Sequence, residues 1–286
     1  MGSSKYHIKI TALAMTAALA AAFGGWFLAA GQQRAPALPP LAAKPVATTT
    51  VSVEVPAEPE AAAARDPQKL AALQERLRQA PEYAAFFEQL RSLFPSDYEA
   101  AVSQALNQGI ATHDEAADLF LAQAVQTLRQ NRGLMGARAG GEALDNLFEQ
   151  HGKVLKQLAA TDSTLCVDFL NGAPARRFVA FAGANRGLMA AEAEAGLAAI
   201  DDGAHKKIER EAPSPEDFDE LERNMLAKGM DKAAVNQLLD GKAPDPPLSD
   251  AQQCRNGLIY LESMKALPEM QRLRLYALAL EVMAHE

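Results

Sequence analysis

The hydrophobic positions along this chain follow two contrasting patterns. Residues 10–30 are free of any charged side chain, whereas from residue 66 onward apolar residues recur every three or four positions among polar ones. A spacing of three and four residues places apolar side chains on one face of an α-helix. The sequence therefore predicts a hydrophobic segment near its start and a long body of amphipathic helices after it.

Residues 10–30 are long enough to span a membrane. A helix of these 21 residues extends about 30 Å, the thickness of the hydrocarbon core of a bilayer, and a secretory signal usually has a shorter apolar region. Nine of the 21 residues are alanine, and Leu28-Ala29-Ala30 also resembles a small-residue cleavage site. The length favours a single-pass transmembrane anchor within residues 1–30, with a cleaved signal peptide as the alternative.

The charges around this segment predict its orientation. Lys5 and Lys9 precede it, and only Arg34 follows it closely. Because positive charges are retained on the cytoplasmic side of a membrane, we expect a cytoplasmic N-terminus and an exported body. In a bacterium this arrangement corresponds to an inner-membrane protein with its body in the periplasm.

A linker is expected to separate the anchor from the body. Residues 31–65 are rich in proline, alanine, threonine and valine, a composition that cannot bury a core and favours an extended, disordered chain. At about 3.1 Å per residue, such a linker reaches at most roughly 100 Å.

Residues 66–286 are expected to form an all-α body of about ten helices. Asp66 before Pro67 is a helix-start signal. Capping boxes, in which a Ser or Thr and an acid or amide three residues later satisfy each other's backbone donors, are expected at 96–99, 112–115 and 249–252. No convincing strand pattern follows residue 66.

Breaks in the helical pattern suggest how this body is divided. Four glycines within residues 133–141 predict a loose turn, and Pro174 is expected to open one long stretch that ends near Ile200. Residues 201–213 read as a charged connection. If the body consists of two domains, residues 201–214 are the best boundary.

The charge of the body excludes one class of partner. The whole chain has a net charge of −8, and residues 67–286 hold 23 Lys and Arg against 32 Asp and Glu. An acidic body is poorly suited to binding a phosphate backbone, so we expect no nucleic-acid partner.

The two cysteines, Cys166 and Cys254, lie in helix-like segments. In an exported chain a cysteine pair tends to oxidise, so we predict a disulfide that joins two helices, with two buried free thiols as the alternative. Neither cysteine has another cysteine or a histidine at metal-ligand spacing. We expect no metal site and no cofactor.

One five-residue sequence occurs twice. Asn131-Arg132-Gly133-Leu134-Met135 recurs as Asn185-Arg186-Gly187-Leu188-Met189. The structural interpretation is a pair of similar helix junctions in which each arginine pairs with a nearby carboxylate. The functional interpretation brings Arg132 and Arg186 together in one cleft that binds an anionic metabolite.

The common catalytic motifs are absent from the sequence, including the nucleophile elbow, the phosphate-binding loop and His-Glu-x-x-His. Glu262-Ser263, which follows Leu258-Ile259-Tyr260-Leu261, resembles the acid-serine motif of lytic transglycosylases. That resemblance implies Glu262 as a general acid. In that family Gly-Leu-Met-Gln follows the acid, whereas here Gly-Leu-Met precedes it, at residues 133–135 and 187–189, without the Gln.

The layout of anchor, Ala/Pro-rich spacer and helical body is similar to that of lipase-specific foldases. The similarity covers layout only, because Arg176-Arg177-Phe178 and Asp217-Phe218-Asp219 do not reproduce their Arg-x-x-Phe-Asp-Tyr-type motif. We therefore expect a non-catalytic protein, anchored through residues 10–30, that binds another protein of the cell envelope as a scaffold, secretion accessory or chaperone-like factor. The alternatives are a cell-wall hydrolase or lyase that uses Glu262, and an anion sensor that uses Arg132 and Arg186.

Overall fold

The computed structural model describes residues 66–170 and 176–284, and over these residues it is all-helical. The predicted all-α class is confirmed for this part, with twelve α-helices where about ten were expected. The predicted anchor and linker lie outside the described residues. The helices are α2 (Pro67–Arg78), α3 (Ala84–Leu93), α4 (Pro95–Asn107), α5 (Ala116–Gly136), α6 (Gly141–Thr161), α7 (Ser163–Leu170), α8 (Arg176–Ala184), α9 (Arg186–Lys206), α10 (Pro215–Ala227), α11 (Lys232–Asp240), α12 (Asp250–Lys265) and α13 (Glu269–Ala284), with short 3-10 helices at Pro81–Tyr83 and Ile110–Thr112.

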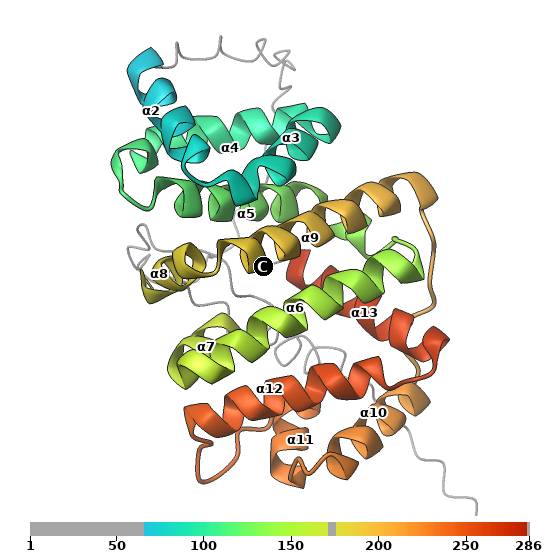
Figure 1. Cartoon of the computed structure of the whole chain (residues 1–286). Helices are drawn as coiled ribbons and strands as arrows, with labels where there is room; N and C mark the ends of the chain where they lie inside the picture. The colour runs from blue at the N-terminus through green and yellow to red at the C-terminus, as the bar shows by residue number, and fades with distance from the viewer. Residues whose placement is uncertain (1–65, 171–175, 285–286) are drawn as a thin grey trace, which may run out of the picture.

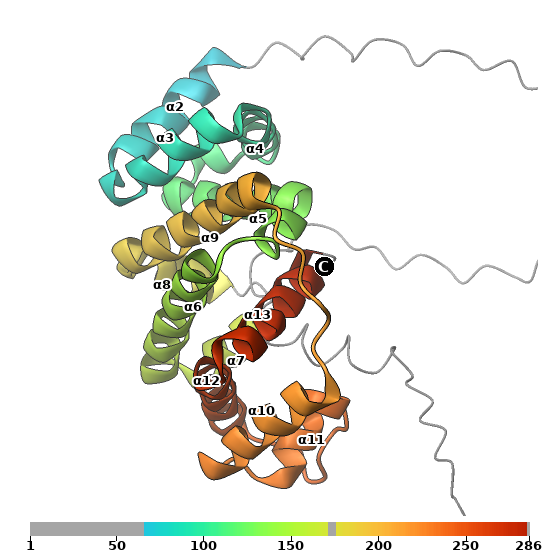
Figure 2. The same cartoon turned by 90° about the vertical axis from the view of Figure 1, so that its right-hand side faces the viewer.

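The helices are stacked along one axis of the molecule (Figure 1). Helices α2, α3 and α4 form one end and α10 and α11 the other, and the turned view shows the same order (Figure 2). Segments that are distant in sequence pack together in the middle, where α9 contacts α5 and α6, and α13 contacts the same two helices. The chain therefore closes on itself around a centre made by α5, α6, α9 and α13.

Buried apolar side chains run through the whole described part as one hydrophobic cluster. Phe87 stacks on Phe120 with ring centroids 4.8 Å apart near the N-terminal end, and Phe169 stacks on Phe178 at 5.5 Å near α7 and α8. Leu221 and Met225 extend the cluster into α10. The core thus continues on both sides of residues 201–214. The division of the body into two domains at this boundary stays a prediction.

Two predicted breaks are present but shorter than expected. Helix α5 continues through Gly133 and ends only at Gly136, and α9 continues to Lys206 across part of the expected charged connection. Tertiary packing explains both, because Gly133 lies against Ala284 of α13 and Gly203 of α9 lies against the backbone of Met135. The long stretch expected to end near Ile200 contains two helices, α8 and α9, separated at Asn185.

Two of the three predicted capping boxes are also wrong. Helix α4 begins at Pro95, before Ser96, and no side chain caps it. Thr112 lies in a 3-10 helix, where its hydroxyl donates to the carbonyl of Gly109. The third box is confirmed, since the backbone N–H of Ser249 donates to Gln252 and the N–H of Gln252 donates to the Ser249 hydroxyl. Asp66 also caps α2 as predicted.

Within residues 66–170 and 176–284, none of the helices combines the length and the apolar character needed to cross a bilayer.

Candidate functional site

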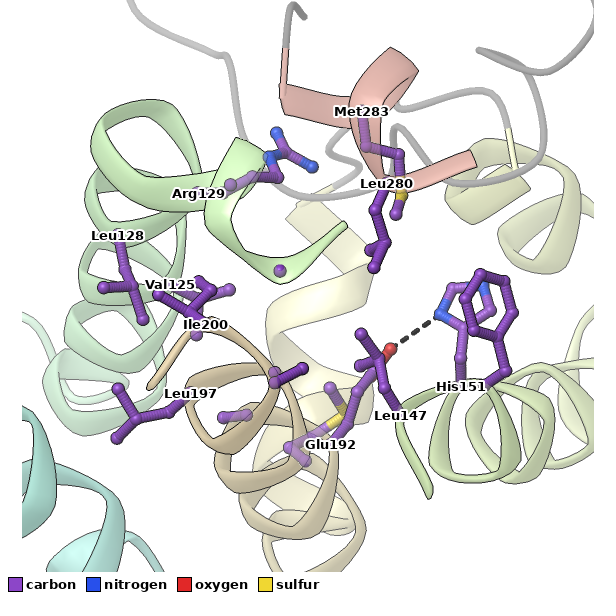
Figure 3. Close-up of a pocket in the computed structure, with 17 residues that line it drawn as sticks. Val125, Leu128, Arg129, Leu147, His151, Glu192, Leu197, Ile200, Leu280 and Met283 are labelled. Atoms are coloured by element: carbon purple, nitrogen blue, oxygen red, sulfur yellow. Dashed lines mark hydrogen bonds and ion pairs between the residues drawn. The ribbon is translucent and has the colours of Figure 1, made fainter. Parts of the chain in front are cut away.

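A cavity of about 130 Å³ lies where α5, α6, α9 and α13 meet. Its walls are mostly apolar, and three polar residues, Arg129, His151 and Glu192, also line it. Figure 3 shows side chains from all four helices around this space, with Leu197 and Ile200 on one side and Leu280 and Met283 on another. Pockets between packed helices are common binding sites for small molecules.

The spacing of residues along α6 and α9 explains how this cavity forms. On α6 the residues Leu144, Phe148, His151 and Leu155 recur at helical spacing and are all buried. On α9 the inward positions are mostly small, and the buried residues include Ala190, Ala193, Ala195 and Ala199. A helix of small side chains approaches its neighbours closely, but it leaves space wherever the opposing side chains do not fill the gap.

The polar centre of the cavity wall is a contact between His151 and Glu192. His151 Nδ1 lies 2.7 Å from Glu192 Oε1, and both side chains are largely withdrawn from solvent. The imidazole ring also stacks on Phe169, with centroids 5.1 Å apart. A carboxylate in this environment needs a hydrogen-bonding partner, because burying it unsatisfied is costly. Because an ionised carboxylate only accepts hydrogen bonds, the contact assigns the His151 tautomer that carries its proton on Nδ1 and donates to Oε1.

The helical spacing of His151 with Phe148 and Leu155 predicts a partly buried histidine, whereas sequence reasoning missed Glu192. A signal for Glu192 does exist. It follows the buried residues Met189 and Ala190 and precedes buried Ala193, so an acidic residue lies next to an apolar helix face. Only the packing of α9 on α6 shows that its partner is a histidine 41 positions earlier in the chain.

The structure does not bring Arg132 and Arg186 into one cleft. Arg132 Nε donates to Asp97 Oδ2 at 3.0 Å, while Arg186 donates to both oxygens of Asp118 at 3.0 and 2.9 Å. Asp118 and Arg132 both belong to α5 and are separated by 14 positions, which corresponds to roughly 20 Å along a helix. Arg132 and Arg186 therefore do not share an anion-binding cleft. The geometry instead matches the structural interpretation, in which each arginine pairs with a nearby carboxylate.

Each of these two pairs belongs to a larger buried network. Asn131 also donates to Asp97, at 2.6 Å. Tyr83 Oη donates to Asp118 at 2.7 Å, and burial together with this contact raises the pKa of Tyr83 well above its usual value. The Asp118 carboxylate in turn raises the pKa of Arg186, mainly through the hydrogen bonds between them.

Glu262 lies on α12 beside a surface pocket of about 230 Å³. Its side chain is 48% exposed and pairs with Lys156 at 3.3 Å. Lys153 and Lys265 line the same pocket, and both pair with Glu149. General acids of glycosidases sit in apolar surroundings that hold them protonated, whereas Glu262 sits among lysines.

Cys166 and Cys254 are joined as predicted, and the bond ties α7 to α12. Both cysteines are buried, and no cysteine in the described part is left as a free thiol. Within the same residues, no three His, Cys, Asp or Glu side chains are grouped so that they could hold a metal ion.

Comparison with known proteins found no matching family model, no matching curated protein and no matching solved structure.

Proposed function

We propose that this chain is an extracytoplasmic helical protein, tethered to the inner membrane by residues 10–30, that acts by binding another protein of the cell envelope. The observation that carries the proposal is the buried disulfide between Cys166 and Cys254. Disulfides persist in oxidising compartments and are rare in the cytosol. A disulfide in the body therefore agrees with the orientation expected from Lys5 and Lys9.

The shape of the body supports a binding role. Its helices are stacked along one axis and present a long outer surface (Figure 1), and helical surfaces of this kind serve as platforms for partner proteins. Met270 on α13 is 73% exposed, more than any other large hydrophobic residue among those described. Exposed methionines are common at adaptable binding surfaces, so Met270 marks the position to probe first.

No specific observation favours the two alternatives. Arg132 and Arg186 are engaged by buried carboxylates at separate places. Glu262 is exposed and paired with Lys156. The protein-binding role and the absence of catalysis therefore remain the preferred proposal.

Photocrosslinking in intact cells tests the proposal. The full chain is expressed with a photoreactive phenylalanine analogue at position 270 or, as the matched control, at exposed Glu281 of the same helix. We expect one discrete adduct from position 270 that Glu281 does not give. The adduct should disappear when an excess of the unlabelled wild-type chain is present, and it should persist when that chain carries Met270→Glu.

Two other results would contradict the proposal. Adducts that are identical from both positions, or absent from both, count against a protein partner at this surface. The hydrolase alternative is favoured instead if solubilised membranes that contain the wild-type chain release fragments from added peptidoglycan, and membranes that contain Glu262→Gln do not.

A further inference from the structure

One carboxylate oxygen of Glu192 has no hydrogen-bond partner within the described part of the chain. Oε1 accepts from His151, but Oε2 is buried and accepts no hydrogen bond from any described residue. The side chain is only 15% exposed. A buried acceptor without a donor lowers stability, so the position of this oxygen at the wall of a cavity calls for a donor that residues 66–170 and 176–284 do not supply.

The cavity around Glu192 suits a small apolar molecule. Its volume of about 130 Å³ is close to that of engineered apolar cavities that bind benzene. Its walls include Leu147, Leu197 and Leu280, which offer no hydrogen bonds to water. The polar atoms at the wall belong to three residues, Arg129, His151 and Glu192. Because each ordered water needs two to four polar partners, the rest of the space accommodates an apolar ring better than a cluster of waters.

Two glycines keep this space open. Gly136 and Gly196 both line the cavity. A Cβ atom at Gly136 would meet its nearest neighbours at 3.6 and 3.7 Å, and one at Gly196 would meet Leu147 at 3.9 Å. Alanine therefore fits at both positions and is the better helix former. Glycine here costs helix stability while it preserves volume inside the protein.

The charges at the wall favour a neutral ligand. Glu192 lines the cavity as an acceptor, but the cation Arg129 lines it as well. A positively charged ligand would be attracted by one and repelled by the other. A neutral hydroxyl can donate to Glu192 Oε2 without bringing a further charge into the apolar space.

We propose that the cavity between α5, α6, α9 and α13 binds a small, neutral, mainly apolar molecule that donates one hydroxyl hydrogen bond to Glu192. His151 positions the carboxylate through its contact with Oε1 and leaves Oε2 for the ligand. This site is distinct from the surface of Met270, and neither export nor a protein partner enters the argument. Failure of one proposal therefore leaves the other intact.

Phenol and toluene form a matched pair of probes, because both are single rings of the same size and only phenol donates a hydrogen bond. The full chain, in a lipid nanodisc, is labelled with ¹³C at its methionine methyl groups. Met189 and Met283 line the cavity and report occupancy, while Met270 is exposed and serves as the internal control. Free probe concentrations are measured at equilibrium, so that uptake by the lipid is accounted for.

We expect both probes to shift the Met189 and Met283 signals saturably and leave Met270 unchanged. Phenol should bind roughly tenfold more tightly than toluene, since a hydrogen bond to a charged acceptor contributes at least that factor. Gly196→Ala should weaken both probes while the protein stays folded, because the added methyl group occupies the cavity. Glu192→Gln should weaken phenol and leave toluene nearly unchanged.

Three results overturn the proposal. The first is no shift at Met189 and Met283 at saturating phenol. The second is equal affinity for phenol and toluene in the wild-type chain. The third is unchanged affinity in Gly196→Ala, which would place the probes outside this cavity.

Discussion

Arg186 and Asp118 form a two-point ion pair that joins the N-terminal turns of α9 and α5, with nitrogen–oxygen distances of 3.0 and 2.9 Å. The Asp118 side chain is 1% exposed, and it also accepts from Tyr83. Bidentate geometry of this kind is specific to arginine. Arg132, the matching arginine in the other copy of the Asn-Arg-Gly-Leu-Met sequence, pairs with buried Asp97 and so joins α5 to α4. In both copies, therefore, the arginine forms an ion pair between two helices.

Removal of the Arg186 side chain should destabilise the fold. Arg186→Ala leaves the Asp118 carboxylate buried without its cation, and we expect a loss of roughly 3 kcal/mol in the free energy of unfolding. Arg186→Lys should fall between this variant and wild type, because lysine keeps the charge but not the bidentate contact. Urea unfolding of the oxidised protein measures both.

Arg177→Ala is the matched control for this experiment. The Arg177 side chain is 56% exposed and pairs with Asp162 and Asp168 at the surface, so the expected loss is within about 0.5 kcal/mol. If Arg186→Ala proves as mild as Arg177→Ala, the ion pair does not hold α9 on α5, and an anion-binding role for Arg186 becomes the better interpretation.

Local chemistry made some of the helix ends predictable. Asp66 caps α2, Ser249 and Gln252 cap α12, and Gly241 ends α11 with a φ of 67°. Each of these ends depends on residues within three or four positions. The same reasoning failed at Ser96, because α4 already begins at Pro95.

The centre of the molecule was not predictable in the same way. Gly133 reads as a helix breaker, yet α5 passes through it because α13 packs there. The contact of His151 with Glu192 joins α6 to α9, and no local pattern encodes that pairing. Helix propensity and capping act over a few residues, whereas the cavity depends on which helices meet.

Asp217 should make stability depend on pH in the acid range. Arg274 donates to both oxygens of the Asp217 carboxylate at 2.8 and 2.7 Å. These hydrogen bonds, chiefly, hold the pKa of Asp217 below its usual value. A carboxyl with a lowered native pKa stabilises the fold above its unfolded pKa, near 3.9, and this contribution is lost as the pH falls through the native pKa.

We therefore expect the free energy of unfolding to fall below about pH 4 more steeply in the wild type than in Asp217→Asn. Above that pH the variant should be less stable by a constant amount. Urea midpoints measured from pH 2 to pH 7 give both quantities. Parallel curves for the two proteins would show that Asp217 contributes nothing to the acid transition.

The disulfide should contribute substantially to stability, because it closes a long loop. Cys166 and Cys254 are separated by 88 positions, and in the chain-entropy model a loop of that length stabilises the fold by about 4.6 kcal/mol. A double variant, Cys166→Ala with Cys254→Ala, should lose about this amount in urea unfolding. Alanine is chosen because both positions are buried, where serine would add an unsatisfied hydroxyl.

Mass spectrometry of unreduced peptides from protein isolated from cells gives the second readout. A linked peptide pair containing Cys166 and Cys254 is expected. Two alkylatable thiols in the isolated protein would contradict the disulfide and would also remove the main support for an oxidising location.

Two glycine substitutions should have opposite signs. At Gly203 of α9 a Cβ atom would lie 1.8 Å from the carbonyl oxygen of Met135, so Gly203→Ala must push α9 away from the end of α5 at a cost of roughly 3 kcal/mol. At Gly152 of α6 nothing lies within 4 Å, and Gly152→Ala should stabilise the helix by about 0.5–1 kcal/mol.

Thermal and urea unfolding of the two variants test the close approach of α5 and α9. That approach also sets the dimensions of the cavity, since Gly203 fixes the separation of these helices at one end while Gly136 and Gly196 leave space further along them. Gly203→Ala should therefore also shift the Met189 methyl signal, and Gly152→Ala should not. If both variants are stabilised, the two helices do not meet as closely as described, and the cavity between them has a different shape.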